Sequence, residues 1–180
     1  MPEIEIRPAV ETDIQVLIQF DHSYSSDHVW QMEYRLEAGQ VGAVFREVRL
    51  PRPVKIDYPR SPGALMIDWQ KRSGLLVAVL NGQPVGYASL SQGSIPFTTW
   101  MTDLVVEHRI RRQGIGSALS LAAQEWVTTQ PGSQRLVLEM QAKNRSAIQF
   151  AQKLGFDFCG FIDHYYPNQD TALIFAKWLV

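Results

Sequence analysis

Cysteine is nearly absent from this sequence, and so is any excess of charge of one sign. Cys159 is the only cysteine, so an internal disulfide or a paired-cysteine zinc or redox site is excluded. Its aromatic surroundings predict a small core residue. The 17 Lys and Arg residues nearly balance the 18 Asp and Glu residues, giving a formal charge of −1. Nucleic-acid-binding proteins usually carry a clear basic excess, so we expect no nucleic-acid partner.

Long apolar runs are also lacking. No stretch approaches the roughly 18 apolar residues of a membrane-spanning helix, and residues 3–7 alternate instead of forming the hydrophobic region of a signal peptide. We therefore expect a cytoplasmic protein with no membrane partner. The four histidines show no metal-ligand spacing, so no metal site is expected. What is present is an ordinary globular composition, 46% apolar over 180 residues, which suits one domain.

The first half of the chain has mixed patterns. Its periodicity predicts a strand over 3–7, and then a helix capped by Thr12 or Asp13 that continues to about residue 20. A second helix is predicted from Asp27 to about Glu37. Segment 39–63 contains four prolines and several arginines, which predicts a long loop. Loops of this length are uncommon without a function, so it is either a cover over a site or a solvated insertion.

The second half is clearer. A buried strand over 75–80 is followed by Asn81-Gly82, the strongest two-residue hairpin signal. Further elements are expected as strands over 85–90, 98–106, 136–140, 156–162 and 171–179, and as helices over 114–129 and 146–154. Because strands and helices interleave around one mixed sheet, the expected fold class is α/β or α+β.

A glycine-rich turn between a strand and a helix, residues 109–119, is the most informative stretch. The first N–H groups of a helix have no internal partner, and the helix dipole is positive there. Glycines let the backbone approach a ligand, and the neighbouring arginines add positive charge. Together these features predict a phosphate or pyrophosphate site. The alternative is a tight turn with an exposed basic loop.

Two other phosphate-binding motifs compete for this turn. A kinase-type P-loop requires Gly-Lys-Ser/Thr, which is missing. The dinucleotide-binding fingerprint is partly matched by Gly114, Gly116 and Glu139. However, Leu119 replaces its third glycine, arginines precede the turn, and little chain follows it for a doubly wound sheet. A dinucleotide enzyme is therefore the weaker alternative.

The turn resembles a known family signature. Residues 111–116 are similar to the Arg/Gln-x-x-Gly-x-Gly/Ala signature of the GNAT N-acetyltransferase superfamily. The preceding strand (103–106) and the later segments 144–148 and 153–156 resemble the same family. The resemblance is good over 75–180 and loose over about 22–70. Residues 138–141 and the C-terminal strand are also similar to the streptothricin-acetyltransferase branch.

This resemblance implies a single GNAT-type domain over residues 1–180, with 75–180 as the acetyl-CoA-binding core and 1–70 as the acceptor side. It implies a mixed, mostly antiparallel sheet, flanked by helices and splayed between its fourth and fifth strands, where the pantetheine arm enters. It places the pyrophosphate on the backbone amides of 112–117. The implied cofactor-binding residues are Leu104, Val105, Val106, Arg111, Arg112, Gln113, Gly114, Ile115, Gly116, Ser117, Asn144 and Ala147.

The implied activity is acetyl transfer from acetyl-CoA to a primary amine of a small molecule or peptide. The expected partners are that amine and, at most, a second copy in a homodimer. A protonated amine must lose a proton before it can attack, so a general base is needed. Glu139, at the end of an apolar strand beside the expected gap, is the first candidate. Asp103, on the facing strand, is the second, with a structural carboxylate as its alternative role.

The acid that protonates the leaving thiolate is less evident. Many relatives carry a tyrosine four residues before Gly155, where this chain has Ala151. Tyr165 and Tyr166 are the substitutes, with aromatic packing as their alternative role. The departure at Ala151 also keeps open a non-catalytic domain that only senses acyl-CoA.

Overall fold

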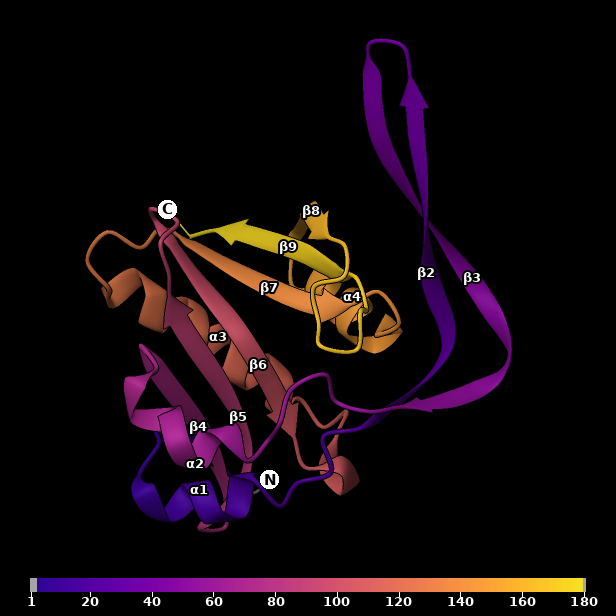
Figure 1. Ribbon diagram of the computed structural model, residues 1–180. Helices are drawn as coiled ribbons and strands as arrows, with labels where there is room; N and C mark the ends of the chain where they lie inside the picture. The colour runs from indigo at the N-terminus through magenta and orange to yellow at the C-terminus, as the bar shows by residue number, and fades with distance from the viewer. Residues whose placement is uncertain (1–2, 180) are drawn as a thin grey trace.

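A seven-stranded sheet with helices on both faces forms the body of the protein (Figure 1). The computed structural model describes residues 3–179. In spatial order the strands are β1 (Ile4–Pro8), β4 (Gly74–Leu80), β5 (Gln83–Gln92), β6 (Thr98–Val106), β7 (Arg135–Gln141), β9 (Ala172–Trp178) and β8 (Asp157–Ile162). The helices are α1 (Glu11–Leu17), α2 (Ala64–Asp68), α3 (Ile115–Thr129) and α4 (Arg145–Lys153), with 3-10 turns η1 (Trp69–Lys71) and η2 (His108–Ile110). This arrangement confirms the predicted fold class.

Alternating side chains divide the interior into two layers. Leu76 and Ala78 of β4 pack on the side covered by α3 and α4. Leu75, Val77 and Val79 pack on the opposite side, against α1 and α2. Both faces of this strand are therefore buried, as expected for a sheet covered by helices on each side. No helix in the described part of the chain is long and apolar enough to cross a membrane.

A long hairpin corrects two sequence predictions. The predicted helix over Asp27–Glu37 is wrong, because Tyr24–Glu37 is strand β2. The predicted loop over 39–63 is also wrong for most of its length, because Gln40–Ile56 is strand β3, which pairs with β2. The prolines at 51 and 53 lie where the pairing is interrupted, between the Ser26–Val54 and His28–Arg49 pairs. At a bulge, proline removes no ladder hydrogen bond.

The base and the middle of this hairpin pack on the body, while the tip projects away from it (Figure 1). Trp30 donates its backbone N–H to the carbonyl of Ala142, at 2.9 Å. Phe45 makes edge-on contacts with Phe158 and Phe161 of β8. Toward the tip, Leu36 and Val41 face each other across the hairpin and are 72% and 85% exposed.

The structure also differs from the sequence predictions at two single positions, the start of the first helix and Cys159. The first helix begins at Glu11 and not beyond Thr12, because the Asp13 carboxylate reaches back to the Val10 N–H at 2.8 Å. Cys159 is exposed and not a core residue, because the pairing of β8 with β9 shifts between Phe158 and Gly160. The predicted Asn81-Gly82 hairpin is confirmed, since both residues adopt positive φ.

The sheet forks between β6 and β7. These strands pair in parallel over a short segment only, in which Thr98–Met101 of β6 lies beside Arg135–Leu138 of β7. Beyond this segment the two strands diverge (Figure 1). At the start of the fork, β6 also contains a bulge, because Met101 and Asp103 pair with consecutive residues of β5 and leave Thr102 unpaired. The predicted splay is confirmed, and it leaves one edge of β6 free of a strand partner over 102–106.

Candidate active site

The glycine-rich turn that follows β6 presents backbone N–H groups at the start of α3. Arg112 and Gly114 have φ values of 65° and 87°, and Gly114 is the N-cap of the helix. Among residues 3–179, no hydrogen bond outside the regular elements uses a backbone N–H between 111 and 117. Successive N–H groups in such a conformation form a concave anion site, which the helix dipole strengthens.

The Arg111 side chain holds this turn in place. Its guanidinium donates to the carbonyls of Val106, Ser23 and Asp21, at 2.9, 2.7 and 2.6 Å. These contacts tie the end of β6 to the segment before β2. Burial lowers the pKa of Arg111, and the three carbonyl acceptors stabilise its charge. Its side chain thus fixes the backbone, while its charge remains close to the N–H groups.

Other residues of the predicted cofactor site lie around the fork. Leu104 and Val106 are half-buried against the core on the α3 side, whereas Val105 is buried on the opposite face. On the other side of the fork, Asn144 caps α4, and its side-chain oxygen accepts the N–H of Ala147 at 3.1 Å. The structure therefore brings the turn, the free edge of β6 and the start of α4 together around the gap.

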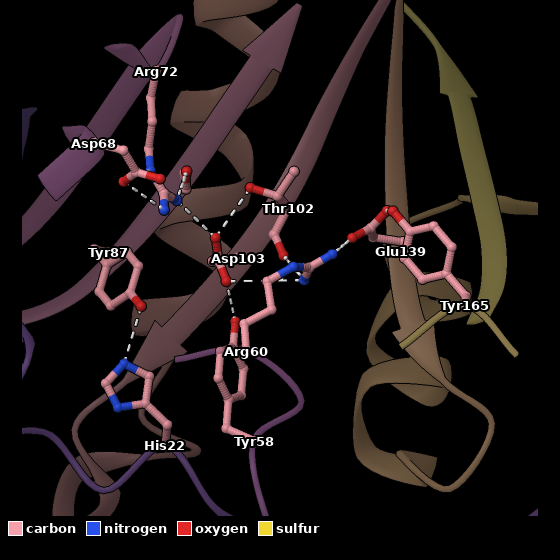
Figure 2. A network of polar contacts seen from close by, with 11 residues as sticks. His22, Tyr58, Arg60, Asp68, Arg72, Tyr87, Thr102, Asp103, Glu139 and Tyr165 are labelled. Carbon is pink, nitrogen blue, oxygen red and sulfur yellow. Dashed lines mark hydrogen bonds and ion pairs between the residues drawn. The ribbon is translucent and has the colours of Figure 1, made fainter. Parts of the chain in front are cut away.

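Glu139 lies on β7, one residue beyond the last pair with β6. Its side chain is 1% exposed. Tyr165 donates its hydroxyl to one carboxylate oxygen at 2.7 Å, and Arg60 forms an ion pair with the other. Figure 2 shows the Arg60 guanidinium in the fork, between β6 and β7. Glu139 is thus a buried carboxylate with one neutral and one cationic partner.

Asp103, on the facing strand, has more partners. Its carboxylate accepts hydrogen bonds from Tyr58, from Arg72 at 2.9 Å and from Thr102 at 3.0 Å, and Arg60 approaches it to 4.0 Å. Burial, together with the Asp103 charge, raises the pKa of Tyr58 well above its usual value. Tyr58 therefore stays protonated and donates.

A second buried pair lies beside this network (Figure 2). His22 contacts the Phe20 carbonyl through Nδ1 at 2.7 Å and the Tyr87 hydroxyl through Nε2 at 3.0 Å. A carbonyl only accepts, so Nδ1 carries the proton and Nε2 accepts from Tyr87. Burial lowers the pKa of His22 and raises that of Tyr87, so both groups are held neutral.

Tyr165 and Tyr166 are adjacent but differ in environment. The Tyr165 side chain is 39% exposed and reaches Glu139. Tyr166 is buried in a small cluster on β7 and β9, and the Arg60 guanidinium lies 5.4 Å from its ring centre. Tyr166 therefore supplies an aromatic face to the fork, and Tyr165 supplies a hydroxyl.

Sequence reasoning missed Arg60, Tyr58 and Arg72. All three come from the segment between β3 and β4. Tyr58 and Arg60 lie in the predicted loop over 39–63, and Arg72 lies between that loop and the predicted strand over 75–80, where no element was predicted. The one available signal is that Arg60 stands between Pro59 and Pro62, residues that stiffen a connection. Nothing in the sequence links this arginine to Glu139.

A family model described as the acetyltransferase (GNAT) family matches residues 43–156. The chain belongs to this family. As a GNAT member it is an acetyl-CoA-dependent N-acetyltransferase, which confirms the predicted activity and co-substrate. The dinucleotide alternative is wrong, because within the described residues only β6 and β7 pair in parallel, whereas a doubly wound sheet is mostly parallel.

Individual relatives agree with this assignment. An N-alpha-acetyltransferase of Sulfurisphaera tokodaii is 27% identical over 157 residues, covering 80% of this chain and 92% of that protein. The solved structure of nourseothricin acetyltransferase has a TM-score of 0.81 at 23% identity and covers 98% of this chain and 99% of its own. A Bacillus anthracis str. Ames protein, assigned as a streptothricin acetyltransferase and solved with acetyl coenzyme A, has a TM-score of 0.75 at 18% identity, with coverage of 98% and 99%.

Proposed function

We propose that this GNAT acetyltransferase acetylates a primary amine of a small cationic molecule, with Glu139 as the general base. Residues 75–180 hold acetyl-CoA, and residues 1–70 contribute to the acceptor side. The observation that carries this proposal is the position of Glu139 at the point where β6 and β7 part. Beyond the point where β6 and β7 part, the free edge of β6 continues to the glycine-rich turn.

The residues around the fork fit acetyl-CoA. The backbone N–H groups of 112–117 suit its pyrophosphate, since they have no other partner outside the helix. The free edge of β6 over 104–106 suits the amide groups of the pantetheine arm, which can add to it like a strand. Asn144 and Ala147 border the arm from the start of α4. Bound acetyl-CoA supplies an acetyl group activated as a thioester.

The roles of the polar residues follow from their partners. Glu139 takes the proton of the acceptor ammonium, and Tyr165 orients it through the 2.7 Å hydrogen bond. Asp103 is a structural carboxylate, because Tyr58, Arg72 and Thr102 already donate to it. Tyr166 contributes its ring and not a proton, since burial raises the pKa of its hydroxyl.

Two observations favour a small cationic acceptor. Glu139 and Asp103 are buried carboxylates that face the fork from opposite strands, so a cation is attracted there. The structural likeness at a TM-score of 0.81 is to a nourseothricin acetyltransferase. A peptide N-terminus is the second candidate, because the relative that is 27% identical is an N-alpha-acetyltransferase.

The test is a thiol-release assay with acetyl-CoA and a panel of amines that includes polyamines, amine-bearing antibiotics and short peptides. Glu139→Gln should lower kcat about 100-fold and leave acetyl-CoA binding by calorimetry unchanged. Glu125→Gln, at an exposed position on α3, is the matched control. Unchanged turnover in Glu139→Gln would remove this residue from the mechanism, and binding of acetyl-CoA without turnover on any amine would favour the sensor alternative.

A further inference from the structure

The Arg60 side chain lies between β6 and β7 at the point where the two strands diverge. It comes from the connection between β3 and α2 and reaches across to both diverging strands (Figure 2). On β6 it donates to the carbonyl of Thr102 at 2.8 Å, the bulged residue. On β7 it pairs with Glu139. One guanidinium thus bridges the two strands where their own hydrogen bonds stop.

Its surroundings are those of a cation site. The Glu139 and Asp103 side chains are 1% and 5% exposed, so their charges require a buried or nearly buried cation. The ring of Tyr166 lies at 5.4 Å from the guanidinium carbon, within the range of a cation–π contact. The Arg60 side chain itself remains 29% exposed, so the site opens to solvent on one side.

The arrangement conflicts with catalysis if it is permanent. A carboxylate that holds an arginine cannot at the same time accept a proton from a substrate at the same oxygen. An acceptor ammonium carries the same charge as Arg60, so an exchange of one for the other leaves Glu139 and Asp103 paired throughout. The exchange therefore avoids the cost of an unpaired buried carboxylate, which is several kcal/mol.

We propose that Arg60 is a resident occupant of the acceptor's ammonium subsite, formed by Glu139, Asp103 and the Tyr166 ring, and that a cationic acceptor must displace it to react. This inference rests on the proposed function and adds the subsite and its selectivity. Neutral molecules cannot displace Arg60, because they would leave the buried Glu139 carboxylate without a cation, whereas Asp103 keeps its ion pair with Arg72. The acceptor's apparent affinity is reduced by the fraction of molecules in which Arg60 occupies the subsite.

The first test measures kcat and KM separately for a cationic amine found with the panel. Arg60→Ala removes the competitor, so KM for the amine should fall at least about threefold, and kcat should stay within about twofold. Lys153→Ala, which removes an exposed cation from α4, is the control and should change neither value. An unchanged or higher KM in Arg60→Ala would overturn the proposal and indicate a permanent counter-ion.

The second test needs no known acceptor and also applies if Arg60→Ala fails to fold. Arg60→Lys places a primary amine in the subsite. With acetyl-CoA, the ammonium should first lose one proton to Glu139, and the neutral nitrogen should then bond to the acetyl carbon as the carbon–sulfur bond breaks. The second proton of that nitrogen passes to the leaving thiolate, so that CoA is released as its thiol. Peptide mapping by mass spectrometry should find one acetyl group at position 60, formed at a rate independent of protein concentration.

The controls separate this proposal from the proposed function. Glu139→Gln combined with Arg60→Lys should abolish the modification, and Arg52→Lys, at an exposed position of the hairpin, should not be modified. No modification at position 60 in an enzyme that acetylates external amines would overturn the resident-cation proposal alone. Failure of the wild type to acetylate any amine, with no modification in Arg60→Lys, would overturn both.

Discussion

At the scale of single residues, the number of partners decides which carboxylate is available for chemistry. Asp103 and Glu139 occupy similar places on facing strands, and the sequence offers both as bases. Three donors occupy Asp103, whereas Glu139 has one neutral donor and an arginine that is partly exposed. Because three donors already satisfy Asp103, this residue holds the network together, and Glu139 remains able to exchange its partner.

His22 gives a prediction about pH. Burial lowers its pKa in the folded protein, so below about pH 6.5, the usual pKa of histidine, the unfolded chain takes up a proton that the folded chain does not. The free energy of unfolding should therefore fall with decreasing pH, by at most about 1.4 kcal/mol per unit from this group. His22→Gln should flatten the pH dependence between about 5 and 6.5 in urea unfolding experiments.

The control is His108→Gln, which changes an exposed histidine and should leave the slope as in the wild type. Asp13, whose pKa is lowered by its hydrogen bonds with Arg7, contributes in a different window. Its stabilisation is lost only as the pH falls below about 4, the usual pKa of aspartate. An identical slope for His22→Gln and the wild type would show that His22 does not titrate differently on folding.

At the scale of elements, the two glycines of the glycine-rich turn differ in why, or whether, glycine is required at their positions. Gly114 has a φ of 87°, and an added Cβ would meet nothing within 4 Å, so its requirement is conformational. Gly116 has an ordinary φ, and its added Cβ would lie 3.7 Å from Phe150, which is normal contact. The first glycine is therefore needed for the backbone and the second is replaceable by a small residue.

Alanine substitutions should distinguish them. Gly114→Ala should destabilise the protein by about 1–2 kcal/mol and weaken acetyl-CoA binding, because the N–H groups that depend on this turn would shift. Gly116→Ala should change the free energy of unfolding by less than about 0.5 kcal/mol. Chemical unfolding and calorimetric titration with acetyl-CoA measure both effects. Equal destabilisation by the two substitutions would contradict this interpretation of the turn.

The elements also show where sequence reasoning was sufficient. Strands with continuous apolar runs, the Asn81-Gly82 hairpin and the turn before α3 were predictable, because each depends on local patterns or turn chemistry. The stretch from Trp30 to Leu36 alternates apolar and polar residues, which is a strand pattern, but its partner strand contains Pro51 and Pro53. The two prolines argued against a strand over β3, because the bulge that accommodates them is recognised only when β3 is paired with β2.

The candidate site was predictable to a similar extent. The turn and Glu139 follow from motifs, which are contiguous in the sequence. Arg60 was not predictable, because its role depends on a contact between the β3–α2 connection and β7, which only the folded chain brings together. Long-range ion pairs of this kind leave no periodic signal.

At the scale of the whole molecule, the hairpin of β2 and β3 is a separate projection from the body (Figure 1). Its contacts with the body lie mainly along its base and middle, including the Arg145–Glu47 ion pair at 2.7 Å. At the tip the two strands mainly contact each other, apart from Tyr34, which contacts Phe161 of β8 and Asp163 of the β8–β9 loop. The tip thus adds little to the core, whereas the middle of the hairpin helps to hold α4 beside the fork.

Shortening the hairpin tests this division. Replacing residues 34–43 with Asn-Gly keeps the Glu33–Val44 pair as the closing pair of a two-residue turn. The free energy of unfolding should change by less than about 1 kcal/mol, and acetyl-CoA affinity should be unchanged. Removing a contact from the middle of the hairpin with Phe45→Ala should cost more, because this ring packs on β8. A shortened protein that no longer binds acetyl-CoA would show that the tip supports the core.

The short parallel segment between β6 and β7 works geometrically as a pivot. Four residue pairs join the two halves of the sheet, so any change of angle between the halves originates there. Displacement grows with distance from a pivot. Glu139, the next residue after the last pair, would hardly move, while the strand ends near Val106 would travel furthest. A change of this angle would therefore adapt the spacing between the diverging strand ends to a long, flexible molecule, while the separation of the reacting groups near Glu139 would stay nearly constant.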